Sequence, residues 1–442
     1  MRTNFSEAQL GDPAMAASEG AIRKCVHCGF CTATCPTYVL LGDELDSPRG
    51  RIYLMKDMLE NERVPTPEVV KHVDRCLSCL SCMTTCPSGV NYMHLADHAR
   101  AYIEQTYRRP LKDRLFRGLL AWVLPHPGRF RLALVVGRWV RPLAPVLGRV
   151  PALRPMRAML DLVPSKFPAR LLSTSRAHPR PLPQAGGEKK RRVAILRGCA
   201  EPVLKPEVRA ATIRVLDRLG YAVVSVPGEV CCGALVHHMG REEASLAAAR
   251  RNVDAWTRLI DEDGLDAILI TASGCGTMIK DYGFMLRGDP SYAAKAEQVS
   301  ALAKDISEFL DGIDLPDGEG RGLSVAYHAA CSLQHGQKVI DAPKRLLAKM
   351  GYKVRTPLEG HLCCGSAGTY NILQPEIAGR LGDRKVAALA RLDADMIATG
   401  NVGCAMQIGQ RAQTPVVHTI ELIDWALGGP RPAALEFAST QR

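Results

Sequence analysis

The residues best suited to chemistry in this chain are two runs of cysteine with the same spacing. The second run repeats the first after an offset of 51 residues, and a proline follows each run. The runs are Cys25-x-x-Cys28-x-x-Cys31-x-x-x-Cys35-Pro36 and Cys76-x-x-Cys79-x-x-Cys82-x-x-x-Cys86-Pro87. Three thiolates at this spacing can surround one cube of iron and sulfide, and the fourth lies just beyond it. The pattern therefore predicts two [4Fe–4S] clusters.

Both runs fit the pattern of bacterial ferredoxins, in which the fourth cysteine of one run ligates the cluster of the other. This resemblance assigns the first cluster to Cys25, Cys28, Cys31 and Cys86 and the second to Cys76, Cys79, Cys82 and Cys35. Zinc is a poorer explanation, because structural zinc usually takes its ligands as two separated pairs. Disulfides are disfavoured because cysteines in such dense runs do not reach the geometry of the bond.

The composition favours a multidomain protein of a reducing compartment. A length of 442 residues is typical of two or three domains. Sixteen cysteines without a secretory signal favour metal ligation over a disulfide framework, so we expect a cytoplasmic protein. No uninterrupted apolar run reaches the roughly 18 residues of a membrane-spanning helix.

Positive charge is concentrated in one segment of the chain. The net charge is +12, yet residues 108–192 carry 20 Lys and Arg against 3 Asp and Glu, so the remainder is acidic. Leu119 and Trp122 follow Arg114 and Arg117 there, as in short amphipathic helices. Such helices can lie on an anionic lipid surface or receive an acidic partner subunit, and a solvated linker is the alternative. We expect peripheral attachment to the cytoplasmic face of the inner membrane and no nucleic-acid partner, because few aromatic side chains interleave.

Between the two cysteine runs the sequence predicts a helix. Ile52, Met55 and Leu59 recur at helical spacing on one face. Arg49 and Arg51 precede them, and either dock a partner, stabilise reduced clusters or form a solvated face. The segment beyond residue 192 alternates apolar strands with helices, which is typical of an α/β fold.

The predicted architecture is α+β and multidomain. An N-terminal helical two-cluster ferredoxin domain is joined by a basic helical connector to a C-terminal pair of α/β repeats. The expected segments are a mobile leader at 1–20, the ferredoxin domain at 21–107, the connector at 108–192, the repeats at 193–322 and 323–430, and a tail at 431–442.

A second cysteine repeat marks the α/β part. Three of its cysteines recur at an offset of 132 residues and the fourth at 129, and glycine follows each cysteine pair. Ligands collect at the carboxyl ends of parallel strands, so we expect two related cluster or redox sites, with buried apolar cysteines as the alternative. The candidates are Cys199, Cys231, Cys232 and Cys275 in the first half and Cys331, Cys363, Cys364 and Cys404 in the second.

These cysteines resemble the cysteine-rich CCG domain of heterodisulfide reductases, lactate-utilisation proteins and the iron–sulfur subunits of glycolate and anaerobic glycerol-3-phosphate dehydrogenases. The fuller domain ends in Cys-x-x-Cys, whereas Cys275 and Cys404 stand alone, which departs from a heterodisulfide-type noncubane cluster site. The whole layout resembles the glycolate oxidase (glycolate dehydrogenase) iron–sulfur subunit. The segments Lys24–Thr37 and Leu41–Arg51 carry this resemblance most clearly.

The resemblance implies an oxidoreductase subunit that acts on a CH–OH group with an acceptor other than NAD or O2. Partner subunits holding FAD would oxidise glycolate to glyoxylate, and this chain would pass the electrons to a respiratory acceptor such as quinone. We do not expect it to oxidise glycolate alone. The alternatives are an iron–sulfur subunit of a lactate or glycerol-3-phosphate dehydrogenase, or a heterodisulfide-reductase-like thiol–disulfide enzyme.

No nucleotide-binding loop is recognisable in the sequence. Gly318, Gly320 and Gly322 precede a strand instead of following one. We therefore expect no flavin or nicotinamide site and no catalytic residue in this chain. Four histidines flank the cysteine elements, each a proton relay, a cluster neighbour or, as favoured here, a hydrogen-bonded structural residue. They are His237, His238, His328 and His335.

Overall fold

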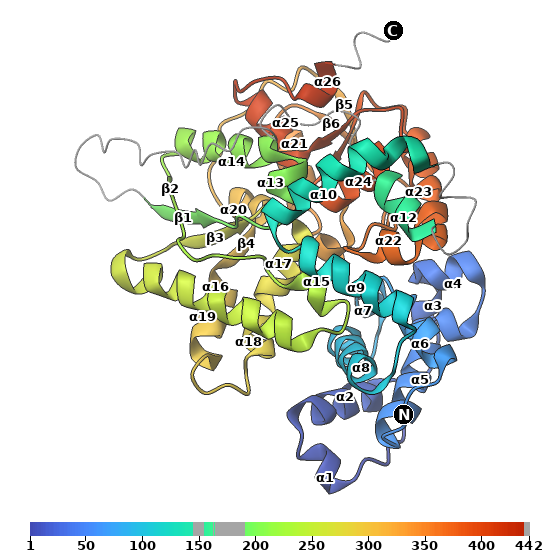
Figure 1. Ribbon diagram of the computed structural model, residues 1–442. Coiled ribbons are helices and arrows are strands. Elements are labelled where there is room, and N and C mark those ends of the chain that lie inside the picture. The colour runs from blue at the N-terminus through green and yellow to red at the C-terminus, as the bar shows by residue number, and fades with distance from the viewer. Residues whose placement is uncertain (145–153, 162, 164–190, 437–442) are drawn as a thin grey trace.

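The computed structural model describes residues 1–144, 154–161, 163 and 191–436, and Figure 1 shows their arrangement. All regular elements of the first 106 residues are helices, and the two cysteine runs lie in and between the short ones. These elements are α1 (Glu7–Leu10), α2 (Pro13–Lys24), α3 (Phe30–Thr34), α4 (Pro36–Leu41), η1 (Glu44–Asp46), α5 (Pro48–Glu60), α6 (Pro67–Asp74), α7 (Ser81–Thr85) and α8 (Tyr92–Thr106).

The helix predicted between the cysteine runs is α5. Its start follows from Ser47, whose hydroxyl accepts a hydrogen bond from the backbone N–H of Gly50. Ile52, Met55 and Leu59 are all buried, as their spacing predicts. α5 therefore supplies an apolar face to the core of the helical module.

Residues 1–20 do not form a separate leader, contrary to the expectation from their small and polar composition. Asp12 caps α2 by accepting a hydrogen bond from the backbone N–H of Met15. Met15 and Ser18 are buried, and the Ser18 hydroxyl lies 2.7 Å from Nδ1 of His98 on α8. One narrow apolar face is enough to dock α2 into the module, although the composition of the segment as a whole is polar.

The basic connector forms helices that lie across the front of the molecule in Figure 1. Leu120 and Leu134 are buried on their inner side, whereas Leu115, Trp122 and Trp139 are exposed. In the described ranges, no helix combines the length and the apolar character that crossing a bilayer requires. Residues 145–153, 162 and 164–190 of the predicted connector lie outside the described residues. The described elements are α9 (Leu111–Val123), α10 (Pro127–Val140), η2 (Arg141–Leu143) and α12 (Arg154–Asp161).

The first α/β unit is built on a four-stranded parallel sheet with the order β2-β1-β3-β4. Val193 of β1 pairs with Val223 of β2 and with Ala267 of β3. β3 is buried along its whole length, which explains its continuous apolar sequence. The elements are β1 (Arg192–Ile195), α13 (Glu201–Leu204), α14 (Pro206–Arg218), β2 (Ala222–Val224), α15 (Ala234–His237), α16 (Glu242–Asp263), β3 (Ala267–Ile270), α17 (Ser273–Lys280), α18 (Tyr282–Met285), α19 (Ala293–Leu302), β4 (Ala303–Asp305) and α20 (Ile306–Asp311).

The second α/β unit repeats this topology, with the parallel order β6-β5-β7-β8. Val325 of β5 pairs with Val354 of β6 and Met396 of β7. The predicted fold class, a helical module followed by two α/β repeats, is thus confirmed. The elements are β5 (Ser324–His328), η5 (Ser332–Gly336), α21 (Ala342–Lys349), β6 (Lys353–Arg355), α22 (Tyr370–Leu373), α23 (Pro375–Ala390), β7 (Met396–Thr399), α24 (Val402–Gly409), β8 (Val416–His418), α25 (Thr419–Ala426) and α26 (Ala433–Glu436).

The two α/β units share one apolar core. Val193 of the first sheet and Tyr327 of the second belong to the same buried cluster. Ion pairs cross the junction as well, since Arg214 and Arg218 of α14 each lie 2.6 Å from a carboxylate oxygen of Asp424 on α25. The halves therefore pack as one continuous body.

Candidate metal centres

The first predicted group of cysteines surrounds one hollow in the helical module. Cys28 is exposed at its rim, and Gly29 beside it takes a φ of 86° where the Arg49 side chain occupies the space of a Cβ. Cys82 of the second run also reaches this hollow. The four residues of the group that line it are Cys25, Cys28, Cys31 and Cys86.

The second predicted group also converges. Burial, together with the nearby thiols of Cys79, Cys76 and Cys35, raises the pKa of Cys82 well above its usual value. The packing of α3 against α7 brings the end of the first run beside the second. The structure thus places each triplet of thiols near the fourth cysteine of the other run.

A buried guanidinium lies beside the second group. Arg51, which is 1% exposed, donates from Nη2 to Oδ1 of Asp46 (3.1 Å) and to Oγ1 of Thr37 (3.0 Å). Its Nε donates to the carbonyl oxygen of His72 (2.6 Å), and its Nη1 lies 3.9 Å from Sγ of Cys35. Of the roles open to this residue in the sequence, a solvated face is ruled out by its burial. Its fixed positive charge stabilises negative charge on the thiolate group.

Cys76 is electrostatically prepared for ligation. Burial alone would raise its pKa, but the charges of Arg51 and Arg100 and hydrogen bonds from Ser78 and Tyr92 lower the pKa below its usual value. The backbone nitrogen of Ser78 lies 3.4 Å and the hydroxyl oxygen of Tyr92 3.8 Å from Sγ. A lowered pKa favours the thiolate, which is the form that binds metals.

Asp43, Asp46 and His72 form a compact polar group nearby, with ligand atoms within 4.8 Å of one another. Asp46 is completely buried, but its carboxylate already contacts Arg51 at 3.1 Å and Arg75 at 2.8 Å. Two guanidinium groups therefore balance its charge. This group joins η1, α5 and α6 through ion pairs and does not resemble a metal site.

The thiols of the first α/β half meet at the carboxyl edge of its sheet. Cys199 follows β1, the Cys231–Cys232 pair follows β2, and Cys275 follows β3. Sγ of Cys231 lies 3.4 Å from Sγ of Cys199, and Cys232 interacts with both Cys231 and Cys275. Gly233 has a φ of 86° directly after the pair, a conformation that favours glycine. The four sulfurs form a continuous row.

The second half builds the same row from Cys331, Cys363, Cys364 and Cys404. Cys363 interacts with Cys331 and Cys364, and Cys364 with Cys404. All four are buried. Nδ2 of Asn401 lies 3.3 Å from Sγ of Cys404 and donates a hydrogen bond to it.

Lys385 of α23 brings a positive charge to this second row. Its side chain is buried, and Nζ donates a hydrogen bond to the carbonyl oxygen of Glu359 at 2.7 Å. Burial lowers the pKa of Lys385, and the neighbouring thiols act in the opposite direction. The thiols that face the ammonium group are Cys331, Cys364, Cys363 and Cys404.

A cavity of about 570 Å³ lies between the two rows of thiols and the connector helices. Leu120, Val123 and Leu134 contribute to its largely apolar wall. Both cysteine-rich sites therefore open on one shared apolar space beneath α9, α10 and α12. The cysteines of the two rows that border it are Cys199, Cys232, Cys275, Cys331, Cys363, Cys364 and Cys404.

The helical module contacts the second row directly. Cys79 packs against the buried cluster that contains Cys331 and Cys363, and it also borders the cavity. Close by, the hydroxyl oxygen of Thr84 lies 2.8 Å from Nδ1 of His335. The second ferredoxin group and the second α/β half are thus neighbours without an intervening layer.

The four histidines noted in the sequence have different surroundings. Nε2 of His237 lies 3.3 Å and Nδ1 of His238 3.9 Å from the carboxylate of Asp97 on α8, so both link the first half to the helical module. His335 is hydrogen-bonded at both ring nitrogens, as expected of a structural residue. His328 is buried without a hydrogen-bond partner in the described part of the chain.

Sequence reasoning missed the polar residues that face the thiols across the fold. Arg100 and Lys385 reach their cysteines from distant helices, and no local motif identifies them. Asn401 did carry a signal, because it lies three residues before Cys404, where a Cys-x-x-Cys pair ending at Cys404 would have its first cysteine. Ala272 occupies the matching position of the first half.

Comparison with protein families agrees with this division of the structure. The 4Fe-4S dicluster domain family matches residues 24–90. The cysteine-rich domain family, CCG, matches twice, at residues 193–280 and 325–409. The chain therefore contains an iron–sulfur domain and two copies of the cysteine-rich domain.

Individual relatives extend the similarity over nearly the whole chain. The glycolate oxidase iron-sulfur subunit of Escherichia coli (strain K12) is 45% identical over 97% of this chain and 99% of its own length. The probable glycolate oxidase iron-sulfur subunit of Bacillus subtilis (strain 168) is 32% identical over 93% and 95%. A crystal structure of a hypothetical protein from Helicobacter pylori is similar in fold, with a TM-score of 0.57 at 10% identity over 98% of this chain and 75% of that chain. The chain belongs to the family of glycolate oxidase iron–sulfur subunits.

Proposed function

We propose that this chain is the electron-transfer subunit of a flavin-dependent complex that oxidises glycolate to glyoxylate. The observation that carries the proposal is an unbroken line of thiols through the molecule. It begins at exposed Cys28, continues through the second ferredoxin group, and reaches Cys331 through Cys79. The names of the relatives support glycolate as the substrate of the complex.

The eight ferredoxin cysteines fit two [4Fe–4S] clusters with exchanged fourth ligands. Each triplet lies near the fourth cysteine of the other run, and Arg51 and Arg100 offset the negative charge of the second group. When bound, such clusters supply one-electron carriers. We also propose the segments assigned from the sequence as the domain division, with residues 1–20 now added to the ferredoxin domain.

The first ferredoxin group is the proposed contact with the FAD-containing partner subunits. Exposed apolar side chains surround the exposed thiol of Cys28, with Val26 and Phe30 in and beside its loop and Tyr53 on α5. Apolar side chains around a redox group suit a protein interface, because a partner that covers them also excludes water. An electron that enters at Cys28 would then pass through the second ferredoxin group towards the cavity.

The connector is the proposed contact with the membrane and its quinone. Its outer face exposes Leu132 and Trp139, the latter 83% exposed, alongside the cations of Lys112, Arg114 and Arg129. Tryptophan and basic residues together suit the interface of an anionic bilayer. The apolar cavity beneath these helices borders the thiols of both α/β halves, so a quinone can approach them there.

The test is to purify the complex anaerobically through a tag on this chain and to add glycolate. We expect a flavin-containing partner, bleaching of its flavin, and reduced-cluster signals in the electron paramagnetic resonance (EPR) spectrum. Cys79→Ser should leave the flavin reducible but prevent reduction of a soluble quinone analogue. A complex that lacks flavin, or that lactate or glycerol 3-phosphate reduces in preference to glycolate, would contradict the proposal.

A further inference from the structure

His328 stands out among the buried polar residues of the second α/β half. It is the last residue of β5 and is completely buried. Neither Nδ1 nor Nε2 has a hydrogen-bond partner among the described residues. A buried polar group without a partner costs roughly 1–3 kcal/mol. Both ring nitrogens are therefore free to bind a ligand.

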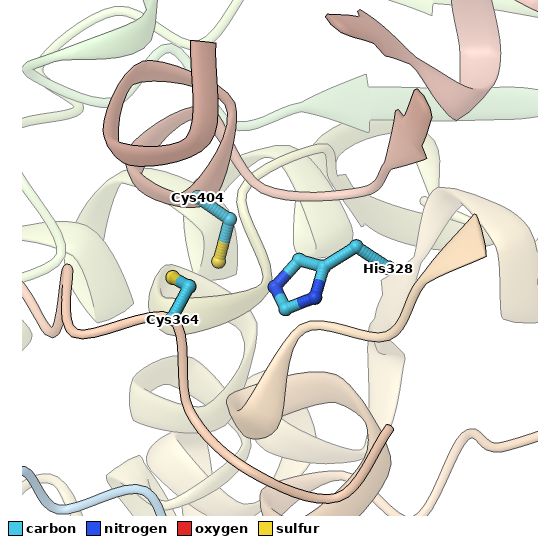
Figure 2. A group of neighbouring side chains, drawn as sticks. All are labelled: His328, Cys364 and Cys404. Carbon is cyan, nitrogen blue, oxygen red and sulfur yellow. The ribbon is translucent and has the colours of Figure 1, made fainter. Parts of the chain in front are cut away.

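The surroundings of the ring indicate what that ligand is. Figure 2 shows the imidazole pointing toward the sulfur atoms of Cys364 and Cys404, and the three ligand atoms lie within 4.8 Å of one another. A metal ion binds imidazole nitrogen at about 2.0–2.1 Å and thiolate sulfur at about 2.3 Å. One ion can therefore contact all three residues at once. The ferredoxin thiols form no comparably tight group within the described ranges, as expected where each sulfur binds a different iron.

We propose that His328, Cys364 and Cys404 bind a thiophilic transition metal in the second α/β half. Imidazole and thiolate are ligands that zinc and iron share, so the donor set selects this class of metal over calcium or magnesium. Cys331 and Cys363 continue the same row of sulfurs and offer further ligands. The proposal goes beyond electron transfer through the ferredoxin groups, because that function does not by itself require a metal ion at His328.

The proposed centre belongs to the second half alone. Three polar residues lie beside its thiols: His328, Lys385 and Asn401. The positive charge of Lys385 offsets the negative charge of a metal–thiolate group in a buried site. In the first half, the positions with the same sequence separation from the matching cysteines carry apolar residues. These counterparts are Leu196 for His328, Val253 for Lys385 and Ala272 for Asn401.

Metal analysis of the full-length chain tests the proposal. The chain is purified anaerobically, and iron and zinc are measured per polypeptide. Two ferredoxin clusters account for about eight irons. We expect additional zinc or additional iron in the wild type and loss of that increment in His328→Leu. Leucine is a suitable replacement because Leu196 fills the matching buried position of the first half.

Two further variants make the result specific. Cys404→Ser should lose the same metal as His328→Leu, and the double variant should lose no more than either, because all act on one centre. Cys275→Ser, at the matching position of the first half, should retain the increment. Wild-type protein without an increment, or folded His328→Leu protein that keeps it, would overturn the proposal.

A measurement on wild-type crystals applies even where the variants do not fold. Diffraction data collected at the iron and zinc absorption edges should show an anomalous peak between the His328 ring and the two sulfurs. The edge at which the peak appears identifies the metal. Crystals that show iron at the ferredoxin groups but no peak at His328 would exclude this centre while leaving the proposed electron-transfer function intact.

Discussion

Nη1 of Arg51 lies 3.9 Å from the sulfur of Cys35, and both side chains are buried. Asp46 and Thr37 hold the guanidinium in place through hydrogen bonds of 3.1 and 3.0 Å. The positive charge therefore stays beside the thiolate group in both the oxidised and the reduced state of a bound cluster. Such a charge stabilises the more negative, reduced state.

Replacement of Arg51 by glutamine should lower the reduction potential of the second ferredoxin centre. The variant should also lose about 3 kcal/mol of folding stability, because the buried carboxylate of Asp46 loses one of its charged partners. The loss should not be larger, since Arg75 and His72 still contact this carboxylate. An EPR-monitored redox titration measures the potential, and chemical unfolding measures the stability. Arg49→Gln is the matched control, since Arg49 lies on the same helix and pairs with Glu44 at the surface. Equal potentials in Arg51→Gln and wild type would contradict the electrostatic role.

The exchange of fourth ligands between the cysteine runs predicts a pattern of paired effects. Cys86→Ser should alter the same EPR signal as Cys28→Ser, although the two residues lie in different runs. Cys35→Ser should likewise alter the signal that Cys79→Ser alters. Anaerobic samples of the four single variants are compared with wild type. If Cys86→Ser instead affects the signal of Cys79→Ser, each run holds its own cluster and the exchanged assignment is wrong.

Removal of the two tryptophans of the connector should weaken attachment to membranes. Trp122→Ser combined with Trp139→Ser takes away large apolar side chains that we expect to enter the lipid interface, and binding should fall at least about tenfold. Co-sedimentation with vesicles of phosphatidylglycerol and phosphatidylcholine measures this. Leu358→Ser is the control, because Leu358 is 97% exposed but lies outside the connector. Equal binding of the double variant and wild type would refute the docking role.

The contribution of Glu421 to folding stability should decrease as the pH rises from 5 to 8. Burial raises the pKa of Glu421 to about 7, against the opposing charge of Lys205. A carboxyl with a raised pKa in the folded state contributes most below its unfolded pKa and loses that contribution as the pH passes 7. Glu421→Gln should therefore lessen the decrease by on the order of 2 kcal/mol.

The comparison uses unfolding curves of wild type and Glu421→Gln at pH 5 and pH 8. Glutamine can still accept the hydrogen bond that the backbone N–H of His418 donates to residue 421 at 3.0 Å. Glu262→Gln, at the exposed end of α16, should follow the wild type at both pH values. If the change in stability between the two pH values is the same in wild type and in Glu421→Gln, the buried carboxyl does not act in this way.

The cysteine sites could be located from the sequence because their ligands come in local motifs and repeats. Cys231–Cys232 and Cys363–Cys364 lie 132 residues apart, and the structure places both pairs in the turn after the second strand of a sheet. The alternation of apolar strands and helices was equally readable, because the inner strands β3, β5 and β7 are buried along their whole length. The positions of the cysteine sites and of the strands and helices were therefore predictable, because they depend on local spacing in the sequence.

The contacts between distant segments were not predictable in this way. Nothing in the local sequence of Cys79 shows that it packs beside Cys331, because that contact depends on how the helical module docks. The polar composition of residues 1–20 concealed the single face that buries Met15. His328 differs from Leu196 across the repeat, but only the structure shows that its ring lacks a partner and faces two sulfurs.

The apolar core beneath both sheets makes the two α/β halves dependent on each other for folding. If the two halves were separated between β4 and β5, each would expose side chains of this shared core, such as Val193 in the first half and Tyr327 in the second. We therefore expect the halves to unfold in one cooperative transition and neither to persist as an isolated fragment. If the two halves arose by duplication, this dependence explains why the first half is retained. The second half needs it in order to fold, even where apolar residues around the thiols of the first half do not support a metal centre.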